Sequence, residues 1–174
     1  MSWNEGVLRL RALEMSDLKL LDAVENDPSH WAAGSTLAPL SRFMLSRYLR
    51  ESAENDIYAL RAWKMVAETP DSHEAVGLVD LFNFEPEHAR VEMGVLVLPA
   101  FRGRHYGAAM VCQTLGYLRE VLHVHEAHCI VAQSNTASQQ MLLRAGFVQS
   151  GVLKDWCRIQ GGYESAFVYQ CLLD

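Results

Sequence analysis

Residues 91–122 read VEMGVLVLPAFRGRHYGAAMVCQTLGYLREVL, and this stretch decides the fold. Its first part alternates apolar and other residues, which predicts a buried strand with Glu92 on the opposite face. Pro99 ends the strand, because proline has no N–H group for a ladder. The apolar residues that follow share one helical stripe: Met110, Val111, Leu115, Leu118 and Leu122. The stretch therefore predicts a strand, a basic loop that contains glycine, and a helix.

The loop between this strand and this helix suggests a ligand. Its residues are Arg102, Gly103, Arg104, His105, Tyr106, Gly107 and Ala108. A helix N-terminus presents about four unpaired N–H groups and the positive end of the helix dipole, and glycine lets a phosphate approach the backbone closely. We therefore predict an anion cradle suited to a pyrophosphate. A purely structural turn is the alternative, since many α/β proteins place glycine between a strand and a helix.

This loop resembles the Gln/Arg-x-x-Gly-x-Gly/Ala signature of the GNAT superfamily of acyl-CoA-dependent N-acyltransferases. His105 departs from the signature, because it stands where the family usually has its first glycine. The resemblance covers nearly the whole chain and is most specific between Gly77 and Phe147, where the pattern is similar to that of spermidine and ribosomal-protein N-acetyltransferases. It implies an α/β (α+β) fold, in which about four helices flank a mixed, mostly antiparallel twisted sheet of about seven strands with splayed central strands.

Periodicity predicts the elements around the central stretch. In chain order they are a strand at 7–13, helices at 16–26 and 41–55, strands at 57–67 and 75–84, then a strand at 128–133, a helix from 135, and a hairpin of 148–159 and 163–172. Short turns predict an antiparallel meander of the strands at 57–67, 75–84 and 91–97. The strand at 128–133 should run parallel to the central strand, because a helix connects them.

Two further expectations concern the first half of the chain. In the helix at 41–55, the buried stripe should comprise Phe43, Met44, Leu45, Tyr48 and Leu49. The segment Ser29–Pro39 has no clean period, and we expect it to be a loop. In the GNAT family, such a loop commonly borders the acceptor site.

Composition limits the classes of protein. At 174 residues the chain predicts a single domain over residues 1–174, and its net charge of −6 argues against nucleic acid as a partner. No apolar run approaches the roughly 20 residues of a membrane span, and the polar start is not a signal peptide, so we expect a cytoplasmic protein. The widely spaced cysteines read as reduced thiols. His123, His125 and His128 lie around a helix end, and we predict no metal site.

The resemblance also implies how a cofactor, acetyl-CoA, would bind. The central strands would leave a V-shaped slot, in which the backbone of Val95, Leu96 and Val97 pairs with the pantetheine arm. The basic loop would hold the pyrophosphate, and Asn135 matches a family asparagine that commonly helps to anchor the cofactor. Its alternative role is a helix N-cap. For His105 we weigh a pH-dependent contact to the cofactor against a ring that points into solvent.

Glu92 is the candidate general base, because it is a lone acid on an otherwise apolar strand and aligns with a glutamate of spermidine N-acetyltransferases. The alternative is an ion pair, for example with Arg90. Relatives of this type carry a tyrosine that protonates the leaving thiolate, but Leu142 occupies that position here. Ser138, one turn earlier on the same face, or a water molecule could substitute.

The resemblance implies an enzyme that transfers the acetyl group of acetyl-CoA to a primary amine by direct attack. The acceptor would be a small cationic amine such as a polyamine, or a protein N-terminus. Glu85 and Glu87 could attract a cation. The alternative is a slow or non-catalytic acyl-CoA sensor, because of Leu142. The aromatic C-terminal hairpin could pair with a second copy to form a homodimer.

Overall fold

The computed structural model describes residues 6–31 and 38–173. These residues form one sheet with the strand order β1-β2-β3-β4-β5-β7-β6. The strands are β1 (Arg9–Ala12), β2 (Trp63–Glu68), β3 (Ala75–Glu85), β4 (Arg90–Val97), β5 (Glu126–Ala132), β6 (Val148–Ile159) and β7 (Gly162–Leu172). The helices are α1 (Leu18–Glu25), α2 (Pro28–Trp31), α3 (Arg42–Glu54), α4 (Ile57–Leu60), α5 (Tyr106–Glu120) and α6 (Thr136–Arg144), with 3-10 turns η1 (Met15–Asp17), η2 (Pro86–His88) and η3 (Pro99–Phe101).

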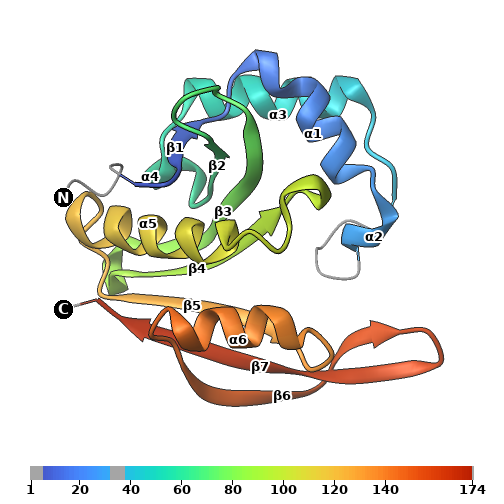
Figure 1. Ribbon diagram of the computed structural model, residues 1–174, viewed down its shortest axis with the longest axis vertical. Coiled ribbons are helices and arrows are strands. Elements are labelled where there is room, and N and C mark those ends of the chain that lie inside the picture. Colours follow the sequence, from blue (N-terminus) through green and yellow to red (C-terminus); the bar gives the residue numbers. More distant parts are fainter. Residues whose placement is uncertain (1–5, 32–37, 174) are drawn as a thin grey trace.

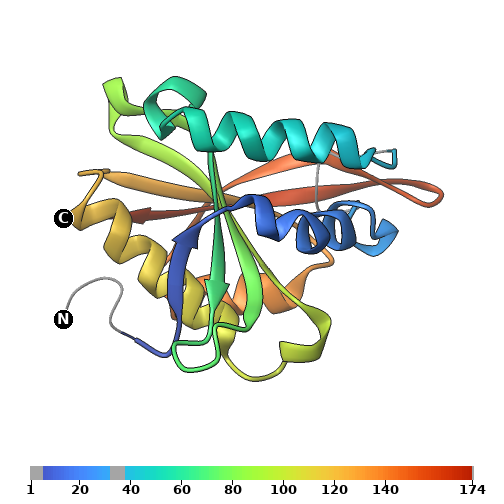
Figure 2. The ribbon, with the colours of Figure 1, turned by 90° about the horizontal axis from the view of Figure 1, so that it is seen from above.

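Helices cover the sheet on both sides, and Figures 1 and 2 show α5 and α6 on one face and α3 on the other. Side chains at alternate positions of β4, such as Val91 and Met93, join a core that includes Met110 of α5 and Leu142 of α6. A second core on the opposite face joins α1 and α3 to β2 and β3. Both faces of the middle strands therefore contact a core, whereas the alternation of the central strand predicts one buried face.

The sheet is mixed in the way that the connections require. Within the described chain, β1 through β4 pair antiparallel, β4 pairs parallel with β5, and β5, β7 and β6 are again antiparallel. The predicted meander, parallel crossover and hairpin are confirmed. The parallel pair needs α5 as its crossover, because a short turn cannot join the ends of two parallel strands.

The β4 and β5 strands separate soon after they pair. Their register comprises Arg90 with Glu126, Val91 with Ala127, and Glu92 with His128, whereas β4 continues to Val97 and β5 to Ala132. In Figure 1 the two strands diverge toward the side on which α2 lies. The splay that the resemblance implied is confirmed.

Two expected elements are wrong because local caps override the apolar pattern. The strand expected at 57–67 begins instead as α4, since the Asp56 carboxylate accepts a hydrogen bond from the Ala59 amide at 2.9 Å and starts a helical turn. Only its second half is the strand β2. The loop expected at 29–39 begins within α2, where Asp27 Oδ1 accepts from the Ser29 amide. The remainder of that expectation, residues 32–37, lies outside the described residues.

The buried stripe of α3 is narrower than predicted. Leu45 and Leu49 are buried, but Phe43 is 76% exposed and Met44 is 51% exposed. The helix packs against α1 along one line of contact, and residues flanking that line point away from it. The helix bounds themselves are confirmed, with Ser41 as the N-cap that accepts from the Met44 amide.

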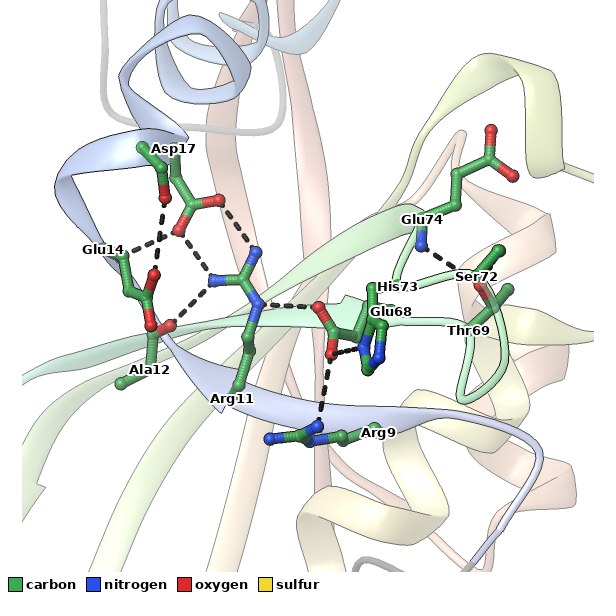
Figure 3. A network of polar contacts seen from close by, with 11 residues as sticks. Arg9, Arg11, Ala12, Glu14, Asp17, Glu68, Thr69, Ser72, His73 and Glu74 are labelled. Carbon is green, nitrogen blue, oxygen red and sulfur yellow. Dashed lines mark hydrogen bonds and ion pairs between the residues drawn. The ribbon is translucent and has the colours of Figure 1, made fainter.

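An ion cluster around Arg11 joins β1, β2 and the turn that starts α1, as Figure 3 shows. The Arg11 guanidinium bonds Asp17 Oδ2 at 2.7 Å and Oδ1 at 2.9 Å, and its Nε bonds Glu68 Oε2 at 2.7 Å. Both carboxylates are buried. Burial opposes their ionisation, but hydrogen bonds outweigh it and lower both pKa values. These bonds come from Arg11 to both groups, from the Glu14 amide to Asp17, and from His73 to Glu68.

Replacing Arg11 with methionine should destabilise the fold by about 3–5 kcal/mol near neutral pH, because two buried carboxylates would lose their cation. Carboxyls whose pKa is lowered in the folded state add stability above their unfolded pKa values and lose it as pH falls through the folded values. The gap between wild type and Arg11→Met should therefore narrow as pH falls toward about 4. Urea unfolding across this pH range measures it.

Arg9→Met is the matched control. Arg9 lies 3.8 Å from Glu68, but its side chain is half exposed, so its loss should cost about 1 kcal/mol or less. Equal losses of unfolding free energy in Arg9→Met and Arg11→Met would contradict the importance assigned to Arg11.

Candidate active site

The open edge of β4 presents unpaired backbone toward β5. The Leu98 amide donates to Val76 O at 2.9 Å, and a Cβ on Gly77 would clash with Leu96 O, so the backbone of Leu96 and Leu98 faces β3. Because successive residues of a strand point their N–H and C=O groups to opposite edges, Val95 and Val97 face the slot. The Val97 carbonyl accepts a hydrogen bond from Arg102 Nε at 3.2 Å. The predicted pairing with a pantetheine arm is thus available to the Val95 backbone and the Val97 amide, whereas the Leu96 backbone is directed at β3.

The basic loop connects the end of β4 to α5 and is exposed from Arg102 to His105. Gly103 has φ 76°, in the left-handed region that favours glycine. His105 also lies in this region, at φ 62°, and is the N-cap residue of α5. Histidine is among the few side chains tolerated in this region, so His105 stands where the family usually has glycine without breaking the loop. The guanidinium of Arg104 lies 5.6 Å from the centre of the Phe101 ring, within reach of a cation–π contact.

The first turn of α5 also lies close to α6. A Cβ on Gly107 would lie 2.7 Å from Met141 Sδ and 3.4 Å from Val97 Cγ2. Glycine therefore lets α5 approach both α6 and the end of β4. This close approach places the helix N-terminus, with its unpaired N–H groups, beside the mouth of the slot.

Arg102 ties the loop to α2. Its Nε donates to Val97 O at 3.2 Å, and its Nη2 lies 3.3 Å from His30 Nε2. The guanidinium can only donate, so His30 Nε2 accepts, and His30 Nδ1 is left to donate to Val24 O at 3.2 Å. The contact fits a neutral His30 ring and brings α2 against the slot.

The other side of the slot mouth is held by α6. Asn135 Oδ1 accepts from the Ser138 amide at 3.2 Å, so Asn135 serves as the N-cap of α6. Ser134 is bound to Glu164 of β7 through its amide at 2.8 Å and its hydroxyl at 3.0 Å. Because the cap uses Oδ1, a contact from Asn135 to a cofactor would come from its Nδ2 amide.

Glu92 lies where β4 and β5 separate. Its side chain is 13% exposed, and Oε2 accepts a hydrogen bond from Asn83 Nδ2 at 2.9 Å. Asn83 has φ 51° and lies where the register of β3 shifts against β4, so an irregularity in β3 aims it at Glu92. Arg90 pairs with Glu85, at 2.8 and 2.9 Å, rather than with Glu92 as the alternative interpretation held.

The structure places a histidine beside Glu92 that the sequence interpretation did not assign to the site. His128 Nε2 lies 3.9 Å from Glu92 Oε2, and His128 Nδ1 lies 3.1 Å from Glu126 Oε2. The buried Glu126 also accepts from Gln170 Nε2 at 3.0 Å. The strand was expected to begin at His128, which left Glu126 in a turn. Extending the alternation of apolar and polar residues by one step would have shown that the side chains of Glu126 and His128 share a face of the strand.

A cavity of about 740 Å³ lies on the same side of the sheet as Glu92. Its lining includes Asn83 and His128, both of which contact Glu92. It is formed by Arg61, Asn83, Phe84, Glu85, Glu87, Arg90, Glu126, His128, Val168 and Gln170. Carboxylates therefore gather beside Glu92.

The acidic turn at the rim of this cavity is paired with cations. Arg61 donates two hydrogen bonds to Glu87, at 2.7 and 2.8 Å, and these lower the pKa of Glu87 to about 2. Glu85 pairs with Arg90. If this turn attracts a cationic acceptor, as the sequence suggested, the ammonium groups must share Glu85 and Glu87 with the arginines or displace the arginines.

The position of the missing tyrosine is occupied by a core side chain. Leu142 is 3% exposed and belongs to the core beneath α5 and α6. Ser138, the candidate substitute, is half-buried on the same helix.

Burial strongly raises the pKa of the Cys129 thiol, and the charges of Glu92 and Glu126 act in the same direction. This thiol stays protonated near neutral pH and is a poor nucleophile.

The splayed strands, the basic loop and Glu92 define the class as acyl-CoA-dependent transferases. Residues 8–148 match the family model described as the acetyltransferase (GNAT) domain. The chain belongs to the GNAT acetyltransferase family, whose members use acetyl-CoA.

Curated relatives and solved structures agree with this assignment. The chain is 24% identical over 165 residues to spermidine N(1)-acetyltransferase of Vibrio cholerae, covering 90% of this chain and 88% of the relative. It is 24% identical over 162 residues to the enzyme of that name from Escherichia coli K12, covering 91% and 82%. The Vibrio cholerae spermidine N-acetyltransferase structure in complex with CoA and spermine superposes with a TM-score of 0.85 at 23% identity, covering 96% of each chain. Across the part that the structure describes, no helix is long and apolar enough to cross a membrane.

We expect the affinity of the protein for acetyl-CoA to rise as pH falls from about 8 to about 5.5, if the His105 ring meets the pyrophosphate as a cation. His105→Gly should flatten this dependence, and titration calorimetry at several pH values measures it. His123→Gly is the matched control, because His123 is also an exposed histidine at positive φ. Profiles of the same slope in wild type and His105→Gly would assign the ring to solvent.

Proposed function

We propose that this protein transfers the acetyl group of acetyl-CoA to a terminal primary amine of a polyamine-like cation. One observation carries the proposal: the parallel pairing of β4 with β5 ends at Glu92 and His128, and the adjoining cavity is lined by Glu126 and by Glu85 and Glu87, which pair with arginines. The slot suits the acyl donor, and the cavity suits a cationic acceptor. The names of the curated relatives, both spermidine N(1)-acetyltransferases, support the same acceptor class.

The donor would lie along the open edge of β4. From Val97 to Glu92 the strand spans about 17 Å at about 3.3 Å per residue, a length that an extended pantetheine arm can follow. The loop would bind the pyrophosphate at one end, which brings the thioester near Glu92 at the other. The residues assigned to the donor are Val95, Val97, Arg102, Gly103, Arg104, His105, Tyr106, Gly107, Ala108 and Asn135. The sequence also assigned Leu96, but its backbone faces β3 and its side chain packs against the core of α1 and α3.

The acceptor must lose a proton before it can attack. An alkylammonium has a pKa near that of lysine, about 10.4, so it is charged when it enters the site. Glu92 is the carboxylate placed to take this proton, and direct attack on the thioester follows. The protonated state of Cys129 argues against an acyl-enzyme on that residue. Ser138 or water would supply the proton for the leaving thiolate, since Leu142 cannot.

An acceptor panel tests the proposal. Purified protein is mixed with acetyl-CoA and spermidine, spermine, a short diamine or a peptide with an unblocked N-terminus, and release of the CoA thiol is followed with product mass. We expect turnover with the polyamines. Turnover confined to the peptide would move the acceptor class to protein N-termini. Saturable acetyl-CoA binding without turnover would favour the sensor alternative, which the buried Leu142 supports.

Glu92→Gln should lower kcat about 10²–10⁴-fold, because the amide keeps the shape of the side chain but takes no proton. Acetyl-CoA affinity should not change, which calorimetry checks beside the rate assay. Glu74→Gln provides a matched control, since Glu74 is an exposed residue in the turn before β3. If Glu92→Gln turns over as fast as Glu74→Gln, Glu92 is not the general base.

A homodimer and a cytoplasmic location stay predictions. The exposed apolar side chains of the β6–β7 hairpin, among them Val148, Trp156 and Tyr163, support contact with a second copy. A related structure is the dodecameric spermidine N-acetyltransferase from Vibrio cholerae, with a TM-score of 0.81 at 24% identity over 96% of this chain and 94% of that one.

A further inference from the structure

We propose that His128, oriented by Glu126, is a proton-relay residue that accepts the proton taken up by Glu92 and releases it to the cavity. The inference rests on the proposed acetyl transfer and adds residues to it that the family resemblance did not indicate. Glu92 and His128 form the last rung of the β4–β5 pairing, so their side chains lie next to each other on the same face.

Glu126 determines which ring nitrogen faces Glu92. Its side chain is 11% exposed, and its carboxylate accepts from Gln170 at 3.0 Å and lies 3.1 Å from His128 Nδ1. A carboxylate accepts hydrogen bonds, so Nδ1 carries the proton in the neutral ring, and Nε2 keeps its lone pair. Nε2 is the atom that lies 3.9 Å from Glu92 Oε2. This is the arrangement of a base that a second carboxylate orients.

The gap of 3.9 Å is longer than a direct hydrogen bond, and it suits transfer through one bridging water or after a small movement of either side chain. Glu92 is 13% exposed and His128 is 22% exposed. His128 also lines the cavity, as does Asn83, which donates a hydrogen bond to Glu92. His128 therefore connects a sheltered carboxylate to solvent.

Two carboxylates face the His128 ring. Glu92 of β4 and Glu126 of β5 lie at its two nitrogens, and Gln170 of β7 is neutral. Across the cavity, the carboxylates and guanidinium groups pair with one another: Arg61 with Glu87 and Arg90 with Glu85. The ring therefore lies between a carboxylate that can pass it a proton and a carboxylate that orients it.

The step balances as follows. The acceptor ammonium gives one proton to Glu92, which passes it to His128 Nε2, and the freed nitrogen lone pair forms a bond to the thioester carbon. The tetrahedral intermediate then breaks its C–S bond, and the thiolate leaves with the electron pair. The second nitrogen proton reaches the sulfur through Ser138 or a water molecule. The products are the amide, the CoA thiol and one proton, which His128 releases to water in the cavity.

His128→Asn tests the relay, because the Asn amide can still donate to Glu126 but takes no proton. We expect kcat/KM for spermidine to fall about 10²-fold near neutral pH, with acetyl-CoA affinity unchanged. In wild type, kcat/KM should also fall at low pH, where a protonated His128 cannot accept another proton. This acidic limb of the pH profile should be absent in His128→Asn. His125→Asn, an exposed histidine at the start of the same segment, is the matched control and should behave as wild type.

The pH profile of Glu126→Gln separates proton transfer from a purely structural role, because a structural role would leave the acidic limb of the profile in place. The amide removes the charge that stabilises the imidazolium, so the acidic limb should shift to lower pH while the rate at higher pH persists. Nitrogen NMR of the resting protein should show the Nδ1-protonated form of His128 in wild type. If His128→Asn fails to fold by thermal unfolding, an unmoved limb in Glu126→Gln overturns the relay by itself.

The outcomes separate the two proposals. Wild-type rates and an unchanged pH profile in His128→Asn would overturn the relay and leave the acetyl transfer intact. A wild type that turns over no amine would overturn the acetyl transfer, and the relay with it. Loss of the acidic limb in His128→Asn, together with its shift in Glu126→Gln, supports the relay.

Discussion

The divergence of β4 from β5 after the pair formed by Glu92 and His128 is the constraint on which the site depends. A strand whose backbone lacks a neighbour must satisfy its N–H and C=O groups with water or a ligand. The Val95 backbone and the Val97 amide point toward the slot, whereas the Val97 carbonyl accepts from Arg102. An extended amide-bearing arm can take the place of the missing strand, which supports this gap in the sheet as the proposed acyl-CoA site.

The divergence is stable because both flanks are held independently. On one side the α5 and α6 core packs against β4 and β5, with Gly107 permitting close approach of the helices. On the far side, the ion pairs of Arg11 with Asp17 and Glu68 join β1 and β2 to the start of α1. The strands at the slot can therefore separate without loosening the rest of the sheet, and this keeps the site open before any ligand arrives.

The chemistry at the apex of the slot is distributed differently from the family pattern. The resemblance implied a tyrosine acid in the helix after β5, but Leu142 occupies that position and is buried in the core. What the structure offers instead is a line of groups on the opposite face, from Glu92 through His128 to Glu126. In the proposed relay, this line carries the proton that leaves the amine. Protonation of the thiolate is left to Ser138 or water.

The sequence by itself determined the order of the elements, the strand–loop–helix around Gly103, and Glu92 as the lone acid of the central strand, because apolar periodicity and turn residues act locally. It misjudged 57–67, where the cap by Asp56 outweighed an apolar run. Only the tertiary structure decided that β4 leaves β5 at Glu92, that His128 lies beside it, and that Glu126 orients the ring. These are pairings between segments far apart in the chain, and periodicity within one segment carries no information about its partner's register.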